Sequence, residues 1–438
     1  MDALYGAALR LAWVASIPYQ IVMEFLSGRP AARRRERIGR AADLARIPVG
    51  GLWVHAVSFG EVRLAHAVIA ALKARLGAVP ILLTTSTGTG RALAERQRRD
   101  AGPGAADAIA APPLDLPGPI GRLLDAARPR ALILIETELW PNLLRLLPAR
   151  GIPVIVVNGR LSPRAFARVL KVRSLFAPGV AAIRCVAAQT EADARRFVAL
   201  GAPAERVRVT GNIKFDLPIP APGPDAPRRR MGLGDDTPMF VAGSTARGEA
   251  EPVARAFAHL RSAVPGAVLV IAPRHPEDVD ATRRVLEQAG RRVALWSGLE
   301  AGAPRAAAVD AVVVDAMGVL PSLYSCATVA FVGGSLVPRG GQNLLEPAAA
   351  GVPVLFGPWV DTVRFAADAL LASGGGFQVS DAASLGDEVL RLTTDAAARA
   401  QAGDRARETV LRNRGPLPRT IDLVVAALEA PAARGAAG

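Results

Sequence analysis

The sequence predicts an α/β protein of two domains, each built around a mostly parallel β-sheet. From residue 51 onwards, short apolar runs alternate with helical patterns, which is the signature of βαβ units. The alternation stops at the proline-rich stretch 217–227 and then begins again. The chain has 438 residues, more than a single core usually serves, so two domains of roughly 200 residues each are expected.

Six apolar runs predict the strands of a first domain that we place at residues 41–216. These runs are 51–57, 80–86, 131–136, 152–158, 183–189 and 207–212. Residues 217–227 hold five prolines and no apolar period, which indicates a semi-rigid linker. A second domain, residues 228–438, has five predicted strands followed by C-terminal helices; the strands are 238–244, 267–273, 311–315, 327–334 and 352–357.

The N-terminal 26 residues are largely apolar but contain Arg10, Gln20 and Glu24. This stretch is near the length of a membrane span, and the basic run RPAARRRERIGR follows it directly. Because the positive charge follows the apolar run, a cleaved signal peptide is disfavoured. We expect residues 1–40 to be an N-terminal membrane-anchor helix with a basic segment, either an uncleaved signal anchor or a helix lying on the membrane. An ordinary buried helix is the alternative.

The formal net charge of +14 suits an anionic membrane surface, an anionic substrate or nucleic acid. Aromatic residues make up only 5% of the chain, and no long basic block or nucleic-acid-binding motif occurs, so no nucleic-acid partner is expected. Cys185 and Cys326 lie far apart in apolar runs. They indicate reduced core residues rather than a disulfide or a metal site.

Polar residues follow several predicted strands of the first domain directly. Ser58 and Glu61 follow the first strand, and Glu136 and Glu138 the third. Lys214 follows the sixth and is one of three lysines among 50 arginines, which marks it as a place where a compact ammonium is wanted. Because ligands bind beyond the carboxyl ends of strands in open α/β sheets, these are candidate site residues. The second domain has similar candidates at Gly243–Thr245, Pro273–His275, Met317–Gly318 and Gly333–Glu346.

Two of these candidates have a structural alternative. Ser58 and Glu61 have the spacing of a helix capping box, although the same carboxylate at a strand end could be a catalytic base. Asn343 and Glu346 repeat that spacing, and such a glutamate could instead accept hydrogen bonds from ribose hydroxyls. No Walker sequence is present, and no GxGxxG follows the first strand, so a P-loop ATPase or a standard dinucleotide enzyme is disfavoured.

Ten motifs, taken together and in this order, resemble those of the Kdo transferases, which attach 3-deoxy-D-manno-oct-2-ulosonic acid (Kdo) to the lipid A precursor. They are HAVSFGE, TTSTGTG, ETELWPN, NGRLS, AQTEAD, GNIKFD, GSTARGE, APRHPE, DAMG and GGSLVPRGGQNLLEP. The motifs span residues 51–358. ETELWPN, and GGSL followed by GGxNxLEP, are specific, whereas the glycine turns alone are not.

The resemblance implies a GT-B glycosyltransferase, with two Rossmann-like, doubly wound domains facing across a cleft. It implies inverting, metal-independent transfer of Kdo from CMP-Kdo to the lipid A precursor, lipid IVA, in lipopolysaccharide core biosynthesis. The acceptor would bind the N-terminal domain and CMP-Kdo the C-terminal domain. No cofactor or metal is expected, and the implied location is the cytoplasmic face of the inner membrane.

The resemblance also implies roles for individual residues. Glu61 matches the general base, in the first helical turn with its carboxylate towards the cleft, and Glu136 and Lys214 match the transition-state stabilisers. The stretches that match CMP contacts are Pro273 and Arg274; Met317, Gly318 and Val319; and Asn343, Leu344, Leu345 and Glu346. The chain departs from the family's usual STHEGE at Ala246 and Arg247, from MGEL at Val319 and from GGHN at Gln342.

Two other functions fit part of the sequence. Another GT-B enzyme that uses a UDP-sugar, either a transferase or an epimerase, would share the architecture. A basic membrane or nucleic-acid adaptor without enzymatic activity would explain the charge but leave the strand-end carboxylates unexplained. The sequence does not set the number of Kdo residues transferred.

Overall fold

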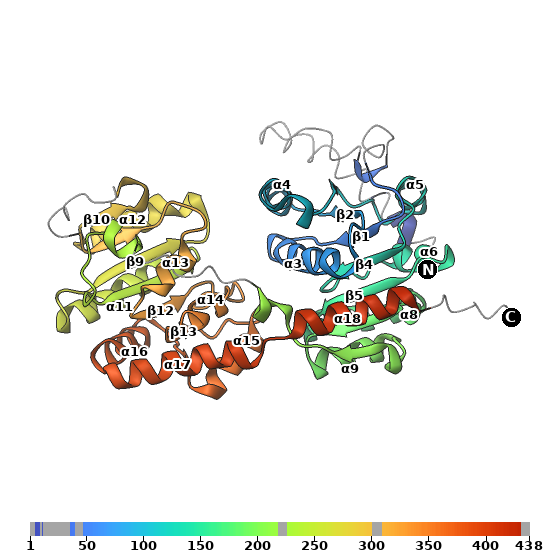
Figure 1. The fold of residues 1–438 in the computed structure, drawn as a ribbon. Helices are drawn as coiled ribbons and strands as arrows, with labels where there is room; N and C mark the ends of the chain where they lie inside the picture. Colours follow the sequence, from blue (N-terminus) through green and yellow to red (C-terminus); the bar gives the residue numbers. More distant parts are fainter. Residues whose placement is uncertain are drawn as a thin grey trace. The chain divides into compact units, whose positions relative to one another are not determined.

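A computed structural model describes residues 5–8, 11, 36–39, 47–217, 226–299 and 309–430. The chain divides into two compact units. Unit 1 comprises Met1–Leu217 with Arg414–Gly438, and unit 2 comprises Pro218–Asn413. Each unit is built around its own parallel sheet of seven strands (Figure 1). The prediction of two Rossmann-like α/β domains is therefore confirmed.

The sheet of unit 1 has the strand order β3-β2-β1-β4-β5-β6-β7. Its central strands are continuous apolar runs, because helices cover both faces of the sheet. Trp53 and Leu132 face one core, which helices α5 and α6 complete, whereas Val54 and Ile133 face another core beneath α3. The strands are β1 (Leu52–His55), β2 (Ile81–Thr84), β3 (Ala108–Ala110), β4 (Ala131–Ile135), β5 (Val154–Gly159), β6 (Cys185–Ala188) and β7 (Val207–Val209).

Most helices of unit 1 follow the strands in βα alternation. They are α3 (Phe59–Leu76), α4 (Gly88–Ala101), α5 (Pro117–Ala127), α6 (Pro141–Ala149), α7 (Pro163–Leu170), α8 (Arg173–Ala181) and α9 (Glu191–Leu200). A short 3-10 helix, η4 (Ile213–Asp216), follows β7. Several helices start at a side chain that the sequence supplies for capping, such as Thr87 for α4 and Thr190 for α9.

The last helix, α18 (Pro416–Glu429), belongs to unit 1, although the sequence analysis assigned the C-terminal helices to the second domain. Ile421, Val424 and Val425 of α18 join the core that α3 covers. The carboxylate of Asp216 also accepts the N–H groups of Gly415 (2.7 Å) and Leu417 (2.6 Å) at the start of this helix. The boundary predicted at 228–438 is therefore wrong at its C-terminal end, because apolar burial and this cap attach α18 to the other sheet.

The sheet of unit 2 has the order β10-β11-β9-β8-β12-β13-β14. Phe240 and Ile271 lie in a core that α11 and α16 cover. The strands are β8 (Met239–Thr245), β9 (Val268–Pro273), β10 (Val293–Leu295), β11 (Ala311–Val313), β12 (Val329–Val332), β13 (Val354–Phe356) and β14 (Gly376–Gln378). The helices are α10 (Ala226–Arg230), α11 (Ala250–Ala263), α12 (Val279–Gln288), α13 (Leu320–Ser325), α14 (Leu345–Ala349), α15 (Arg364–Ser373), α16 (Ala382–Thr394) and α17 (Ala396–Arg412).

All eleven predicted strands are present, and the sequence analysis missed β3, β10 and β14. Each missed strand has three residues and lies at an edge of its sheet. An edge strand pairs on one side only and is less buried than a central strand, so it needs no long apolar run. Length and hydrophobicity therefore identify the central strands and miss these three.

The predicted anchor and linker fall largely on residues that the structure does not describe. Among residues 1–40 the described ones are 5–8, 11 and 36–39, and among residues 217–227 they are 217, 226 and 227. The linker prediction is too long at its end, because Ala226 and Pro227 start α10, where a proline is tolerated in the first turn. No helix in the described part of the chain is both long and apolar enough to cross a membrane.

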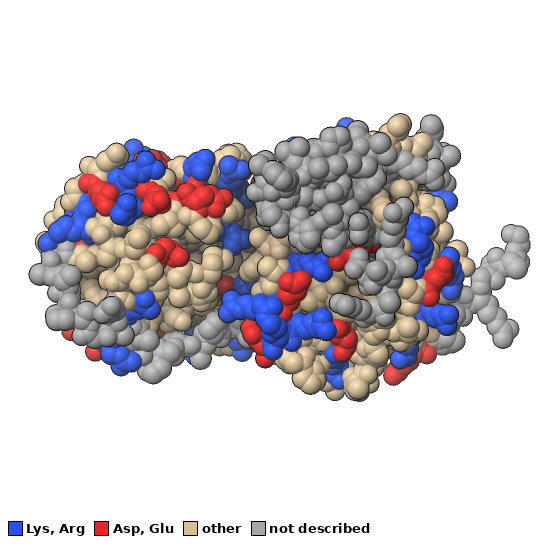
Figure 2. Space-filling model, turned by 90° about the horizontal axis from the view of Figure 1, so that it is seen from above, with Lys and Arg blue, Asp and Glu red and all other residues tan. Residues whose placement is uncertain are grey.

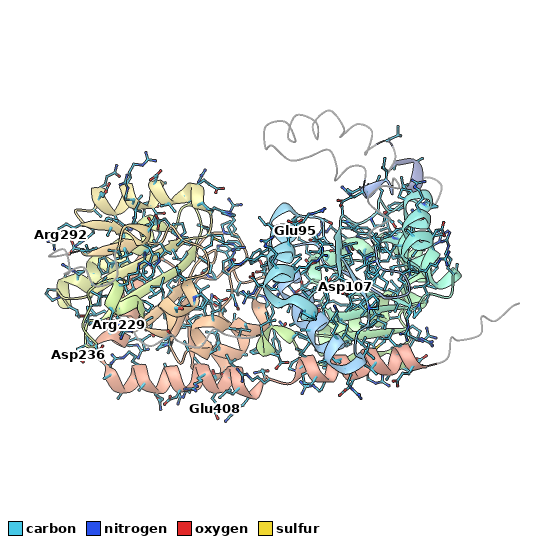
Figure 3. The ribbon with its side chains drawn as sticks, turned by 45° about the horizontal axis from the view of Figure 1, so that its top comes forward. Glu95, Asp107, Arg229, Asp236, Arg292 and Glu408 are labelled. Carbon is cyan, nitrogen blue, oxygen red and sulfur yellow. The ribbon has the colours of Figure 1, made fainter. Side chains whose placement is uncertain are left out.

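Charged side chains of both signs are interspersed on the face shown in Figure 2. One charged pair has a structural role in unit 1: Nζ of the half-buried Lys73 lies 2.9 Å from the carboxylate of the exposed Asp107, a residue labelled in Figure 3. The same carboxylate accepts the N–H of Ile81 (2.7 Å), so Lys73 supports the start of β2.

Candidate active site

Strands β1 and β4 lie side by side in the sheet although two other strands separate them in the sequence. Their carboxyl ends form a topological switch point, which is where open α/β sheets bind ligands. Glu61 follows β1, and Glu136 and Glu138 follow β4. Lys214, in η4 after β7, reaches the same place by pairing with Glu136. The structure thus brings together the three catalytic residues that the resemblance implies.

Glu61 lies in the first turn of α3 and also caps it. Ser58 is the N-cap residue, and its hydroxyl oxygen accepts the N–H of Glu61 (3.4 Å). In return, the Glu61 carboxylate accepts the N–H of Val57 (2.6 Å) and the hydroxyl of Ser58 (3.0 Å). The structural alternative from the sequence is therefore present in the molecule, and the N–H of Val57 makes the short backbone bond to the carboxylate.

The capping bonds do not prevent the Glu61 carboxylate from accepting a proton from a substrate. A carboxylate has about four lone-pair positions on its two oxygens, and each oxygen of Glu61 has one partner within the protein. Burial raises the pKa of Glu61 above its ordinary value, the bond from Val57 lowers it, and the charge of Glu136 raises it again. A raised pKa makes the carboxylate a stronger base, so the cap and a base role are compatible.

Glu136 and Lys214 form an ion pair with a distance of 3.0 Å between Nζ and Oε1. The side chains are 16% and 30% exposed, respectively, so water only partly screens the pair. Glu136 has a φ of 63°, a left-handed conformation that is uncommon outside glycine. Residues held in such conformations concentrate at functional sites.

Two asparagines place Lys214. The side-chain oxygen of Asn158 accepts the N–H of Ile213 (2.9 Å), and that of Asn212 accepts the N–H of Lys214 (3.0 Å). Asn158 is fully buried and also has a positive φ, of 54°. Asn158 of NGRLS and Asn212 of GNIKFD therefore both hold the turn that carries Lys214. The sequence alone does not show that these two motifs are in contact.

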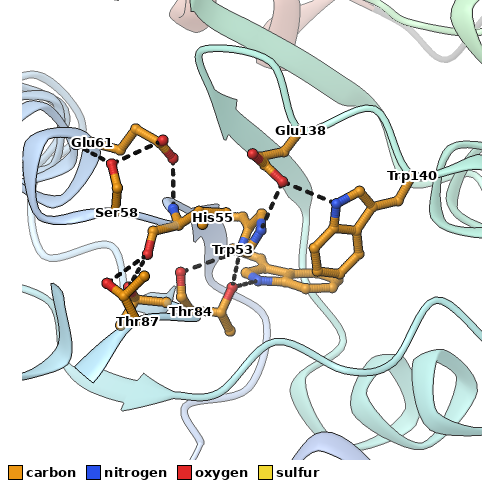
Figure 4. A network of polar contacts seen from close by, with 10 residues as sticks. Trp53, His55, Ser58, Glu61, Thr84, Thr87, Glu138 and Trp140 are labelled. Carbon is orange, nitrogen blue, oxygen red and sulfur yellow. Dashed lines mark hydrogen bonds and ion pairs between the residues drawn. The ribbon is translucent and has the colours of Figure 1, made fainter. Parts of the chain in front are cut away.

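Glu138 belongs to the same cluster, although the sequence analysis gave it no role in catalysis. Its Oε2 accepts the indole N–H of Trp140 (3.0 Å) and lies 4.0 Å from Nε2 of His55 (Figure 4). Burial raises the pKa of Glu138 to about 7, and the charges of Glu61 and Glu136 add to this effect. The signal in the sequence that could have indicated a catalytic role for Glu138 is its position two residues after Glu136.

In unit 2 the predicted donor-binding stretches follow neighbouring parallel strands. Pro273 ends β9 and Arg274 follows it, donating its N–H to the carbonyl of Thr245 at the end of β8 (2.8 Å). Met317 is 67% exposed, and Gly318 has a φ of 86°. Val319 is the N-cap residue of α13, without a side-chain capping bond. The chain therefore presents backbone groups, rather than a carboxylate, at position 319.

Glu249 is a structural residue that the sequence analysis missed. It is fully buried, and its carboxylate accepts four backbone N–H groups at 2.7–3.0 Å, from Ala246, Gly334, Ser335 and Leu336. Gly333 is required beside it, because a Cβ there would lie 2.5 Å from Cα of Thr245 and 2.7 Å from Oε2 of Glu249. Glu249 therefore joins the loop after β8 to the loop after β12, at the switch point of the second sheet.

At Asn343 and Glu346 the structural alternative, a capping box, is not formed. Helix α14 begins at Leu345 with Leu344 as its N-cap residue, so Asn343 lies before the cap. Asn343 instead accepts the N–H of Leu345 (3.2 Å) through its side-chain oxygen and donates its amide to Glu346 Oε1 (3.1 Å). The two side chains hold each other across a turn, with one Asn-to-backbone bond of the kind that starts turns.

In the described ranges, no group of three or more histidine, cysteine, aspartate and glutamate side chains is placed to hold a metal ion. Cys185 is buried, Cys326 is half-buried, and both are free thiols.

Comparisons with known proteins agree along most of the chain. The family model "3-Deoxy-D-manno-octulosonic-acid transferase (kdotransferase)" matches residues 32–217. The 3-deoxy-D-manno-octulosonic acid transferase of Bordetella pertussis is 36% identical over 391 residues, covering 88% of this chain and 90% of that protein. The enzyme of the same name from Haemophilus influenzae is 32% identical, covering 92% and 93%.

A solved structure supports the fold independently. A glycosyltransferase from Rickettsia africae superposes with a TM-score of 0.60 at 11% identity, covering 87% of this chain and 100% of that one. This likeness shows the GT-B-like arrangement of each unit and nothing about the substrate. The family follows from the extended identity to the two curated transferases: the chain belongs to the 3-deoxy-D-manno-octulosonic acid transferases, and it is a glycosyltransferase.

Proposed function

We propose that the protein transfers Kdo from CMP-Kdo to the lipid A precursor, lipid IVA, with inversion at the anomeric carbon and without a catalytic metal. Family membership supports Kdo transfer in lipopolysaccharide core biosynthesis. The observation that carries the finer proposal is the cluster of Glu61, Glu136 and Lys214 at the switch point of unit 1. This cluster combines a carboxylate of raised pKa with a separate ion pair.

Glu61 acts as the general base. It takes the proton of an acceptor hydroxyl while that oxygen forms its bond to the anomeric carbon of Kdo. The bond from this carbon to the CMP phosphate breaks, and its electron pair leaves with the phosphate. Attack from the face opposite the leaving group gives inversion. Glu61 keeps the hydrogen bonds to Val57 and Ser58, which hold its carboxylate in one orientation during the transfer.

Glu136 and Lys214 stabilise the charge that develops in the transition state. The anomeric carbon becomes oxocarbenium-like, next to the carboxylate of the sugar donor, so both signs of charge require a partner. A preorganised ion pair supplies both without reorganisation during the reaction. Lys214 also stabilises the released CMP phosphate, because its ammonium group is positively charged.

The donor site is proposed for the strand ends of unit 2. Arg274, directly after β9, is the proposed cation for the CMP phosphate, and Met317, Gly318 and Val319 supply backbone contacts. Asn343, Leu344, Leu345 and Glu346 would contact the nucleoside, with Glu346 held by Asn343. A phosphate leaves as an anion and requires no general acid. Cations at this site therefore account for a metal-independent reaction.

The proposed location is the cytoplasmic face of the inner membrane. The support is the apolar N-terminal stretch with its basic run in the sequence, together with an acceptor that resides in that membrane. Vesicle flotation with full-length protein and with a variant lacking residues 1–40 tests this proposal. Equal recovery of both proteins in the lipid fraction would contradict a role of the N-terminal segment.

The decisive experiment incubates the purified full-length protein with CMP-Kdo and lipid IVA and measures the product mass. A mass increase of one or more Kdo residues is expected, and the mass counts the additions. Activity in excess EDTA tests metal independence, and NMR of the new glycosidic bond tests inversion. Thermal stabilisation by UDP and not by CMP, with no Kdo product, would instead favour an enzyme that uses a UDP-sugar.

A further inference from the structure

We propose that Glu138 is a further catalytic residue: it keeps its proton while Glu61 is ionised, and its carboxyl group donates a hydrogen bond to a sugar hydroxyl of the acceptor. This inference rests on the proposed role of Glu61 as base. It arises from a network that joins Glu138 to the core of unit 1 through His55 and Trp140 (Figure 4).

Carboxyl groups outnumber cations in this cluster at the switch point of unit 1. Three carboxylates, Glu61, Glu136 and Glu138, influence one another's charge at the switch point, and Lys214 pairs with Glu136. Within the part of the chain that the structure describes, no lysine or arginine forms an ion pair with Glu61 or Glu138. Two neighbouring carboxyl groups without a cation cannot both ionise cheaply, so one of them keeps a proton near neutral pH.

The two carboxyl oxygens of Glu138 have different surroundings. Oε2 accepts the indole N–H of Trp140 at 3.0 Å and is the oxygen closer to His55. Oε1 has no hydrogen bond within the described residues. A proton on Oε1 therefore has no acceptor in the protein and is available to a ligand. In Figure 4 the carboxyl groups of Glu61 and Glu138 are turned towards each other, which agrees with the effect of the Glu61 charge on Glu138.

His55, next to Glu138, is 1% exposed and has no hydrogen-bond partner on Nε2. Its Nδ1 lies 3.2 Å from the carbonyl and 2.8 Å from the hydroxyl of Thr84, and that hydroxyl accepts the indole N–H of Trp53 (2.8 Å). When Nδ1 donates its proton to the Thr84 carbonyl, Nε2 turns a lone pair towards Glu138. A lone pair facing a carboxyl group opposes its ionisation.

The electrostatics agree with this geometry. Burial lowers the pKa of His55 to about 4, so the imidazole is neutral at physiological pH and offers Glu138 no positive charge. Burial and the charges of Glu61 and Glu136 raise the pKa of Glu138 to about 7, while the Trp140 bond lowers it. The titratable groups that influence Glu138 from neighbouring elements are therefore His55, Glu61 and Glu136. Neighbouring carboxyl groups whose pKa values differ can take separate roles, here Glu61 as base and Glu138 as donor.

The protons balance without a further reactant. The acceptor hydroxyl gives its proton to Glu61, its oxygen bonds to the anomeric carbon, and the electron pair of the broken bond leaves on the CMP phosphate. Glu138 retains its own proton throughout and donates it in a hydrogen bond only. Ionisation of Glu138 above neutral pH therefore removes a donor, which predicts a fall in activity on the alkaline side.

The test measures kcat/KM for lipid IVA against pH with the full-length wild type, Glu138→Gln and Glu138→Ala. Glutamine matches the size of a neutral glutamic acid and still donates, so Glu138→Gln should retain activity within about tenfold and lose the fall above pH 7. Glu138→Ala should lose about tenfold or more below pH 7, where the wild type still has the donor, and the difference from wild type should shrink above pH 7. Glu205→Gln, at an exposed position of the same unit, should leave the profile unchanged.

A second variant reads the pKa of Glu138 without altering its carboxyl group. Trp140→Phe removes the indole N–H that favours the ionised form, so the alkaline fall should move to higher pH. The proposal is overturned if Glu138→Gln is as inactive as Glu138→Ala, or if it keeps the wild-type alkaline fall. Full activity of Glu61→Gln would instead refute the proposed base, and with it the underlying function, whatever the Glu138 variants show.

Discussion

Lys214 Nζ lies 3.0 Å from Glu136 Oε1, and the two residues come from distant segments of unit 1, after β7 and after β4. Neither residue is more than one-third exposed, the N–H of Glu136 is bound by the carbonyl of Val157 in β5 (3.0 Å), and the N–H of Lys214 is bound by the side chain of Asn212 (3.0 Å). The pair therefore holds a fixed charge of each sign at the place where the proposed reaction separates charge.

Replacing Lys214 by alanine should reduce kcat by about 10²- to 10³-fold, as expected for loss of a preorganised electrostatic group. Lys214→Arg retains the charge but not the compact ammonium, so it should recover only part of the activity. Initial rates at saturating CMP-Kdo and lipid IVA provide the measurement. Lys171→Ala, at an exposed lysine, is the matched control. An alanine variant within twofold of wild type would exclude Lys214 from the transition state.

Replacing Glu61 by glutamine should reduce transfer by about 10²- to 10⁴-fold, the usual contribution of a general base. The amide oxygen can still accept the N–H of Val57, so the variant should fold and bind CMP as the wild type does. Ser58→Ala removes the N-cap oxygen at a cost of about 1 kcal/mol, together with the hydroxyl bond to Glu61, and it should keep most of the activity because the Val57 N–H still holds the carboxylate. Product mass over time and thermal unfolding would measure both effects, and rapid transfer by Glu61→Gln would show that Glu61 is only a cap.

Glu249→Gln should destabilise unit 2 by about 3 kcal/mol and weaken CMP binding. Glutamine offers one acceptor oxygen where the carboxylate receives four N–H groups, and its amide N–H₂ would face backbone donors. Denaturant unfolding and calorimetric titration with CMP would measure the two effects. Glu251→Gln, at an exposed position in the same helix, should change stability by less than about 0.5 kcal/mol. Equal stability of the two variants would mean that the loops after β8 and β12 do not depend on Glu249.

The stability difference between Glu138→Gln and wild type should increase with pH. The pKa of Glu138 rises from 4.5 to about 7 on folding, so its stabilising contribution is complete below pH 4.5 and is lost as the pH rises to about 7. Glutamine cannot ionise, so the variant should gain on the order of 3 kcal/mol relative to wild type between pH 4.5 and pH 8. Urea unfolding across this range would measure the gain, and a difference that does not vary with pH would contradict the raised pKa.

His55 should influence stability in the opposite direction. Its pKa falls from 6.5 to about 4 on folding, so its contribution is complete above pH 6.5 and is lost as the pH falls to about 4. In the wild type the two contributions oppose each other between about pH 4.5 and pH 6.5. In Glu138→Gln only the histidine contribution remains, so unfolding of that variant should depend more steeply on acid pH than unfolding of the wild type.

The central strands and the strand-end motifs could be predicted because their signals are local. A strand buried on both faces is apolar over most of its length, as β4 is over Ala131–Ile135 and β5 over Val154–Val157. The short edge strands β3, β10 and β14 have no such requirement, and their pairing partners are distant in sequence. Helix α18 was assigned to the wrong unit for the same reason, since its apolar face and the Asp216 bonds at its start are specified by contacts across the chain.

The sequence by itself determined that the chain has two parallel α/β units and belongs with the Kdo transferases, and it identified Glu61, Glu136 and Lys214 as candidates. These follow from periodicity and from motifs that lie within a few residues of each strand end. Only the tertiary structure decided that Lys214 pairs with Glu136, that Glu61 also caps its helix, and that Glu138 faces a buried neutral His55. The physical reason is that hydrogen bonding, burial and pKa depend on which strand ends become neighbours in the sheet. The order of strands in the sheet differs from their order in the sequence.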